Sequence, residues 1–133
     1  MQFTVTTPQR LALVDITDQV NAALARSAVK DGLCNLFTTH TTAALVIVEN
    51  WDPDVAADLL HHLEKLVPRD GDFRHAEGNA QAHILSALYG VSLTVPIRDG
   101  QLALGRWQGV MLAEFDGPRE RHVLVTTLGA LPS

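Results

Sequence analysis

Alternating and helically spaced hydrophobic residues divide this chain into short strands and three helices. The alternation is clearest over 91–97, where every second residue is large and apolar. Pro8 separates the first two strands, because proline offers no N–H to a central ladder. The pair Asp99-Gly100 predicts a tight turn between two later strands. The predicted strands cover residues 3–7, 10–16, 33–39, 44–49, 91–97, 101–104, 110–115 and 121–128.

Each predicted helix has recognisable start and stop signals. The first begins at Thr17, whose hydroxyl is expected to cap the free amides, and ends at Asp31-Gly32. Asp52-Pro53 opens the second, which Pro68 stops. Asn79 opens the third and Gly90 ends it. Helical spacing predicts that the second helix faces inward through Val55, Leu59, Leu63 and Leu66, with His61 and His62 exposed or structural.

The order of these elements predicts the fold class. Most strands follow one another through short turns, and residues 110–115 and 121–128 are expected to form a hairpin around Asp116-Gly117-Pro118-Arg119. Helices are set among the strands without the strict alternation of a parallel sheet. The prediction is an α+β fold with a largely antiparallel sheet or sandwich and about three helices, in a single domain over 1–133.

Composition narrows the possible partners. Apolar residues make up 47% of the chain and charged residues 19%, as in globular proteins. The net charge of −5 and the absence of a basic run argue against binding to nucleic acid or to an anionic membrane. Cys34 is the only cysteine, which favours a reducing compartment, and its place in a predicted strand favours a buried apolar role. We expect a soluble cytoplasmic protein.

Three groups of polar residues interrupt the regular pattern at predicted loops. They are His40-Thr41-Thr42, the stretch from His75 to His83, and Trp107-Gln108 together with Asp116 and Arg119. His40, His75 and His83 are candidate ligands of a catalytic zinc ion, with Glu77 as a proton carrier or as a residue that orients a ligand. Because the spacing matches no helical pair of histidines, metal-free acid–base chemistry and ordinary hydrogen bonding stay open.

Other residues suggest an anionic ligand. Arg119 could pair with a phosphate or a carboxylate, although a salt bridge to Asp116 or Glu120 would also explain it. A helix that starts at Asn79 would present backbone amides to an anion. Trp107 could stack on a flat ring, but a tryptophan in a small sheet protein more often belongs to the core.

Several of these motifs together resemble one family. They are His40-Thr41-Thr42-Ala43-Ala44-Leu45, Glu49-Asn50, Asp52-Pro53-Asp54-Val55, His75-x-Glu77-Gly78-Asn79-Ala80-x-Ala82-His83-Ile84, Gly105-x-Trp107-Gln108-Gly109 and Glu114-Phe115-Asp116-Gly117-Pro118-Arg119. In this order, from about Leu11 to the C-terminus, the chain resembles the YjbQ-like family, often described as secondary thiamine-phosphate synthases.

The resemblance implies both an assembly and a reaction. The assembly is a homotrimer with a YjbQ-like fold. The reaction is a weak or side activity that joins a pyrimidine diphosphate to a thiazole phosphate with loss of diphosphate. By motif position, His40, His75, Glu77, Asn79 and His83 would form the core of the site, and Trp107, Gln108, Asp116 and Arg119 would line it. The chain departs from the family pattern at Val48, Ala76, Gln81 and Arg106.

Three functional hypotheses follow from these observations. The first is an enzyme that handles a small phosphorylated heterocyclic substrate, with Thr41 and Arg119 as anion contacts and a divalent metal, zinc or magnesium, as a candidate cofactor. The second is metal-assisted hydrolysis of a small ester or phosphate. The third is a non-catalytic trimeric binding module whose histidines form a pH-sensitive contact.

Overall fold

The computed structural model describes residues 1–131 and confirms the α+β class, with strands that pair only antiparallel in this part of the chain. Within these residues, no helix is both long and apolar enough to cross a membrane. The elements are β1 (Gln2–Thr6), β2 (Ala12–Asp15), α1 (Thr17–Ala25), β3 (Gly32–Phe37), β4 (Ala43–Glu49), α2 (Pro53–Leu66), α3 (Ala80–Tyr89), β5 (Ser92–Arg98), β6 (Gln101–Leu102), β7 (Gln108–Glu114) and β8 (Glu120–Gly129).

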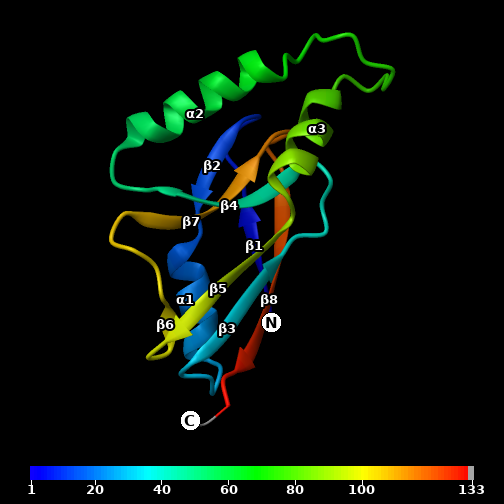
Figure 1. Cartoon of the computed structure of the whole chain (residues 1–133). Coiled ribbons are helices and arrows are strands. Elements are labelled where there is room, and N and C mark those ends of the chain that lie inside the picture. The colour runs from blue at the N-terminus through cyan, green and yellow to red at the C-terminus, as the bar shows by residue number, and fades with distance from the viewer. Residues whose placement is uncertain (132–133) are drawn as a thin grey trace.

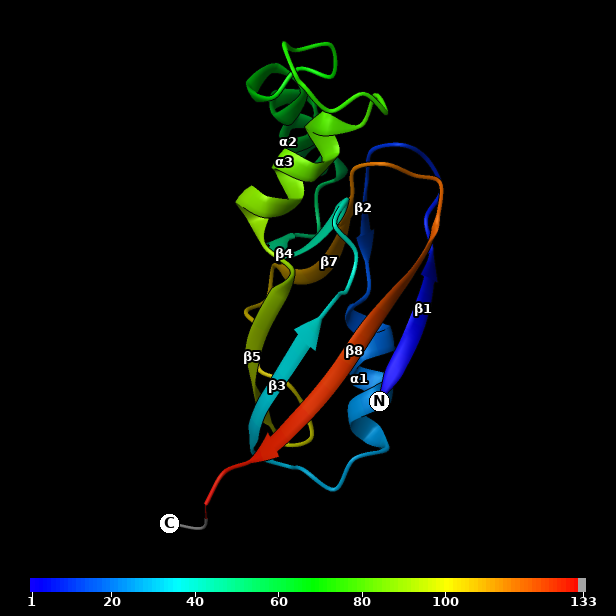
Figure 2. The same ribbon diagram turned by 90° about the vertical axis from the view of Figure 1, so that its right-hand side faces the viewer.

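The strands form two sheets, and the chain crosses repeatedly between them. One sheet has the order β1-β8-β3-β5-β6 and the other has the order β2-β7-β4 (Figures 1 and 2). Among residues 1–131, only β5 and β6 are adjacent in the sequence and also paired, and they use the predicted turn at Asp99-Gly100. Both turn residues have positive φ, which suits a two-residue hairpin.

The smaller sheet is covered on both faces, so the molecule has three layers. Ala43, Leu45 and Leu112 belong to a core shared with α1 and the larger sheet. Ala44, Ala113 and the adjoining Phe115 face the other way, against α2 and α3. Because β7 is central and buried on both sides, it appears in the sequence as a continuous apolar run instead of an alternating one.

The predicted hairpin of 110–115 and 121–128 is wrong. β7 pairs with β2 and β4, whereas β8 pairs with β1 and β3, so the segment between them carries the chain from one sheet to the other. Gly117 is required in this crossing, because a Cβ there would lie 2.3 Å from the backbone oxygen of Gln9. Two strands close in sequence therefore pass each other without pairing.

Helix starts were predicted correctly, but the caps of α1 and α3 and the end of α1 were not. Asp52 accepts a hydrogen bond from the Asp54 N–H at 2.9 Å, as expected for the start of α2. α1 does begin at Thr17, but the Thr17 hydroxyl donates to Asp15 and accepts from the Val110 N–H, so it caps nothing. α1 also ends at Ala25, well before Asp31-Gly32.

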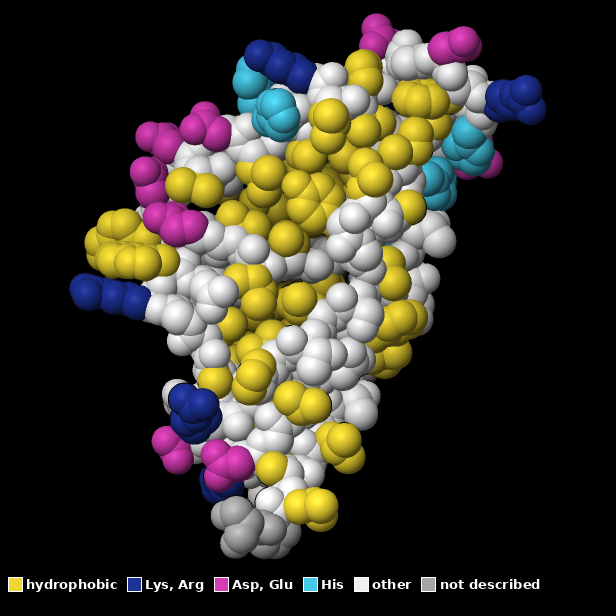
Figure 3. All heavy atoms as spheres, in the orientation of Figure 1, with side chains coloured by type: hydrophobic (Ala, Val, Ile, Leu, Met, Phe, Trp, Pro, Cys, Tyr) yellow, Lys and Arg dark blue, Asp and Glu magenta, His cyan; other side chains and the backbone are white. Residues whose placement is uncertain are grey.

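The apolar stripe of α2 is only partly buried. Leu63 is buried and Leu59 is half-buried, but Val55 is 37% exposed and Leu66 is 61% exposed. His61 and His62 are exposed, as predicted. In Figure 3 hydrophobic side chains spread over the centre of this face, between α2 and the strands below it. Much of the inward stripe predicted for α2 is therefore open to solvent in the single chain.

Cys34 has the buried position that the sequence predicted. It lies in the middle of β3 and belongs to the core between the sheets. Burial raises the pKa of the Cys34 thiol to about 11. The thiol is therefore protonated at neutral pH and behaves as a small apolar side chain.

Candidate functional site

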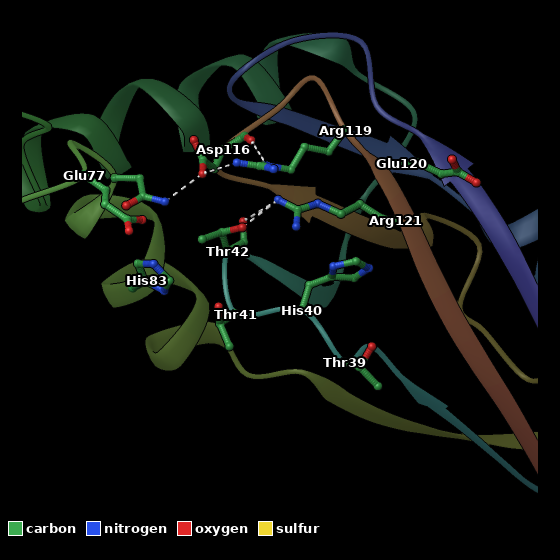
Figure 4. A pocket seen from close by; sticks show the side chains of 11 residues that line it. Thr39, His40, Thr41, Thr42, Glu77, His83, Asp116, Arg119, Glu120 and Arg121 are labelled. Carbon is green, nitrogen blue, oxygen red and sulfur yellow. Dashed lines mark hydrogen bonds and ion pairs between the residues drawn. The ribbon is translucent and has the colours of Figure 1, made fainter. Parts of the chain in front are cut away.

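The main polar cavity opens where two of the chain crossings between the sheets meet the start of α3. It has a volume of about 650 Å³ (Figure 4). The β3–β4 crossing and the β7–β8 crossing are tied together by a hydrogen bond from the Phe115 N–H to the Thr42 carbonyl at 3.2 Å. The lining residues are Thr39, His40, Thr41, Thr42, Glu77, Asn79, His83, Asp116, Arg119, Glu120 and Arg121.

Arg121 forms the inner end of this cavity. It is only 2% exposed and forms an ion pair with the fully buried Glu114. Its Nε donates to Glu114 Oε1 at 2.8 Å, and its Nη2 donates to Glu114 Oε2 and to Thr42 Oγ1. These bonds hold two edges of the guanidinium. In Figure 4 the other terminal nitrogen points toward the space between Thr42 and His40.

Glu114 is held ionised by the groups around it. Burial alone would raise the pKa of Glu114, but hydrogen bonds from Arg121, from the Asp116 N–H and from the Thr7 hydroxyl outweigh it and lower that pKa below its ordinary value. The carboxylate therefore keeps its charge and fixes the Arg121 guanidinium.

Asn79 connects the start of α3 to the β7–β8 crossing. Its Nδ2 donates to Asp116 Oδ2 at 2.9 Å, which leaves Oδ1 facing His75 Nε2 at 2.9 Å. Asn79 precedes α3 as predicted, although its side chain does not cap the helix. Arg119 also pairs with Asp116, at 3.1 Å from Oδ2. This confirms the predicted salt bridge and leaves Arg119 at the rim, with a half-exposed side chain.

The pKa of Asp116 reflects these contacts. Burial pushes the pKa of Asp116 upward, but the hydrogen bonds from Asn79 and Arg119 and the charge of Arg119 pull it below its usual range. Asp116 is therefore a carboxylate that organises two cavity residues.

The His40 imidazole is neutral, and one of its two nitrogens already accepts a hydrogen bond. Its Nε2 accepts a hydrogen bond from the His122 backbone N–H at 3.0 Å, and its ring stacks on the His122 ring at a centroid distance of 5.7 Å. Partial burial and the positive charge of Arg121 lower the pKa of His40. Because Nε2 accepts, the proton of the neutral ring is on Nδ1.

The unfolding free energy is expected to fall as the pH is lowered from 6.5, and His40 contributes to this fall. Since its folded-state pKa lies below the ordinary 6.5, the unfolded chain takes up the proton first. The stability present above pH 6.5 is then lost as the pH falls through the folded-state pKa. Urea unfolding over a pH series should show a flatter profile for His40→Gln. His61→Gln, on the exposed face of α2, should follow the wild type; equal slopes in all three proteins would contradict this assignment.

The structure does not assemble His40, His75 and His83 into one group. The rings of His75 and His83 are 5.1 Å apart, but His75 faces a separate hollow and does not line the cavity. His75 Nε2 is bonded to Asn79, and His40 Nε2 is bonded to a backbone amide. Among residues 1–131, no three His, Cys, Asp or Glu side chains are placed to hold a metal ion together. The donor set of one chain therefore does not fit the three-histidine zinc site suggested by the sequence.

Trp107 and Gln108 lie apart from the cavity. Trp107 is 45% exposed, so the alternative that placed it in the core is wrong. It lies against Trp51 at 5.6 Å, with the Arg106 guanidinium 4.8 Å from its ring. Gln108 accepts from the Gly105 N–H. Arg106 is thus engaged with an aromatic ring, and it does not line the cavity.

Gln81 has a structural role. It is buried, accepts from Arg10 Nη1 at 3.0 Å and donates to the Val67 carbonyl at 2.8 Å. It therefore joins the end of α2 to α3, and its departure from the family pattern does not alter the cavity lining.

Sequence reasoning missed Arg121 and its partner Glu114. A signal was present, because Arg121 is in phase with Val123 and Val125 on the buried face of β8. A charged residue in phase with a buried apolar face requires a buried partner. The partner could not be identified without knowing that β7 and β8 belong to different sheets.

Comparisons with known proteins agree with this fold. The family model described as "UPF0047 protein YjbQ-like" matches residues 1–130. A UPF0047 protein of Methanocaldococcus jannaschii is 45% identical over 128 residues, covering 96% of this chain and 93% of its own. The UPF0047 protein YugU of Bacillus subtilis is 40% identical over 124 residues, covering 92% and 94%.

Solved structures show the same architecture. A YjbQ/UPF0047 family protein of Clostridium acetobutylicum superimposes with a TM-score of 0.93 at 44% identity, covering 96% of this chain and 99% of its own. A conserved hypothetical protein of Thermus thermophilus gives a TM-score of 0.90 at 48% identity, with the same coverage. Both the sequence and the fold therefore match over almost the full length, and the chain belongs to the YjbQ-like (UPF0047) family.

Proposed function

We propose that this chain is an enzyme that binds a small phosphorylated heterocyclic substrate in the cavity at Arg121. The observation that carries the proposal is the buried guanidinium, which Glu114 and Thr42 hold on two edges while another nitrogen points toward the cavity. A guanidinium fixed in this way is a preorganised donor for a phosphoryl oxygen.

Further groups around the cavity suit an anion. Thr41 and Thr42 add hydroxyl groups, and Arg119 at the rim adds a second guanidinium. Asn79 lies where α3 begins, at the positive end of the helix dipole. A phosphoryl group would therefore meet Arg121 at its inner side and Arg119 at its outer side.

His83 and Glu77 are the proposed proton carriers. Both side chains line the cavity from the α3 side (Figure 4). Imidazole and carboxylate groups commonly give and take protons near neutral pH when they are positioned next to the reacting atoms. His40, whose Nε2 is engaged with the backbone, would orient the substrate as a hydrogen-bond donor through Nδ1.

Thiamine-phosphate formation is the reaction to test first. It joins a pyrimidine diphosphate to a thiazole phosphate, and the leaving diphosphate needs compensation of its negative charge, which Arg119 and Arg121 would supply. A Mg²⁺ ion often accompanies such a diphosphate and needs only one or two protein carboxylates. Glu77 is a cavity carboxylate that would suit that ion.

We also propose that the enzyme acts as a homotrimer in the cytoplasm. The partly exposed stripe of α2, with Val55 and Leu66 open to solvent, supports association of copies. A reducing compartment is consistent with the free thiol of Cys34.

Arg119→Met is expected to weaken the binding of inorganic phosphate and diphosphate by about tenfold, as for the loss of one hydrogen bond to a charged group. The variant loses the rim guanidinium and leaves Arg121 in place. Isothermal titration calorimetry of the full chain with each anion measures the change.

Arg98→Met is the matched control, because Arg98 is exposed at the end of β5 and does not line the cavity. It should bind both anions as the wild type does. Wild-type protein that binds neither phosphate nor diphosphate at millimolar concentration would refute the proposed function.

A further inference from the structure

A second hollow, which we call the apolar pocket, adjoins the polar cavity. Its volume is about 420 Å³, and its own walls come from the end of β3, the second half of α3 and the connection from α3 to β5. The residues it does not share with the cavity are Phe37, Thr38, Ser86, Ala87, Gly90 and Val91. The two hollows share Thr39, His40, Thr41 and His83 as a common wall.

Two hydroxyl groups of the apolar pocket, those of Ser86 and Thr38, are already bonded to the backbone. Ser86 Oγ donates to the Ala43 carbonyl at 2.7 Å, and Thr38 Oγ1 donates to the His122 carbonyl at 2.8 Å. These residues and Ala87 therefore present a mainly apolar surface to a ligand. A volume of this size falls in the range of pockets that hold small organic molecules.

Gly90 keeps one side of this pocket open. Its φ of 95° is in a region that L side chains rarely adopt, and no atom lies within 4 Å of the position of a Cβ there. The chain thus turns from α3 toward β5 without placing a side chain in the space. An apolar hollow next to a charged one, with a shared wall, suits a ligand with two chemically different ends.

We infer that the cavity and the apolar pocket form one bipartite site for an organic monophosphate with a compact, uncharged ring or chain. The phosphoryl group lies at Arg121 and the carbon body lies against Ala87 and Val91. The bond that joins the phosphoryl group to the carbon body then lies beside the residues that line both hollows, next to Thr41 and His83. This inference rests on the proposed function, because it assumes that the cavity binds the phosphoryl group.

Phenyl phosphate and inorganic phosphate are the probes that test the inference. By calorimetry, the wild-type protein should bind phenyl phosphate at least about tenfold more tightly than phosphate, because the ring removes apolar surface from water. Ala87→Phe should fill the apolar pocket and abolish this preference while leaving phosphate binding unchanged. Ala87 is exposed on α3, so the larger side chain does not enter the core.

Ala57→Phe is the matched control, because Ala57 is an exposed alanine of α2 that does not line either hollow. It should keep the wild-type preference. If the wild type binds phosphate but prefers it to phenyl phosphate, or binds both equally, the bipartite site is refuted and the proposed function stands. If neither probe binds, the proposed function itself fails. If Ala87→Phe keeps the preference but changes the mass measured by light scattering, the pocket is a contact between copies and the inference is overturned.

Discussion

Glu114→Ala is expected to lower the free energy of unfolding by about 3–5 kcal/mol, the usual effect of removing one partner of a buried ion pair. The substitution leaves the Arg121 guanidinium charged at a site where the side chain is only 3% exposed. It also removes the acceptor of the Thr7 hydroxyl and of the Asp116 N–H. Denaturant unfolding followed by circular dichroism measures the loss.

Two further variants separate the cost of leaving one buried charge unpaired from the contribution of the ion pair to the free energy of unfolding. The double variant Glu114→Leu/Arg121→Met should recover much of the lost stability, since apolar side chains of similar volume can replace a buried pair. Glu64→Ala removes the partly exposed partner of Arg10 and should cost only about 0–1 kcal/mol. If the double variant is as unstable as Glu114→Ala, the ion pair itself stabilises the fold, and the loss in Glu114→Ala is not only the cost of an unpaired charge.

His83→Ala is expected to lower the rate of the coupling reaction by about 10²–10⁴-fold, the usual contribution of a positioned acid–base group. The substrate affinity measured by calorimetry should change much less, because Arg119 and Arg121 remain. The assay joins a pyrimidine diphosphate to a thiazole phosphate with purified protein.

His62→Ala is the control for this variant, since His62 is exposed on α2 and lines no part of the cavity. It should retain the wild-type rate. Equal product formation by His83→Ala and the wild type would remove His83 from the mechanism, whereas a loss in His62→Ala as well would point to a change in the assembly.

The sequence predicted the elements well because each depends on local chemistry. Asp52-Pro53 starts a helix wherever it occurs with an apolar stripe behind it, and Asp99-Gly100 closes a tight turn. The pairing of strands is not local. The apolar run of β7 could have paired with β8, but both edges of β7 are occupied, one by β2 and the other by β4.

The candidate site was predicted in part for the same reason. His40, Thr41, Glu77, Asn79, His83, Asp116 and Arg119 do line one cavity, because their loops meet at the crossings between the sheets. His75, Trp107 and Gln108 do not line it, since nothing in their spacing specifies the direction of a side chain. Arg121 was missed because its importance depends on Glu114, which comes from the other sheet.

The pairing of β1 with β8 sets the order in which the protein can be completed during synthesis. Gln2 is registered with Leu124 and Thr6 with Glu120, so β1 has no partner in the sheet until β8 has been synthesised. β3 also has β8 as a neighbour, so two strands of the larger sheet expose an unpaired edge until the C-terminal strand is released. Folding through such distant contacts is slow compared with folding through local ones. The larger sheet therefore depends on β8 for its completion, and β8 delivers Arg121 to the cavity in the same step.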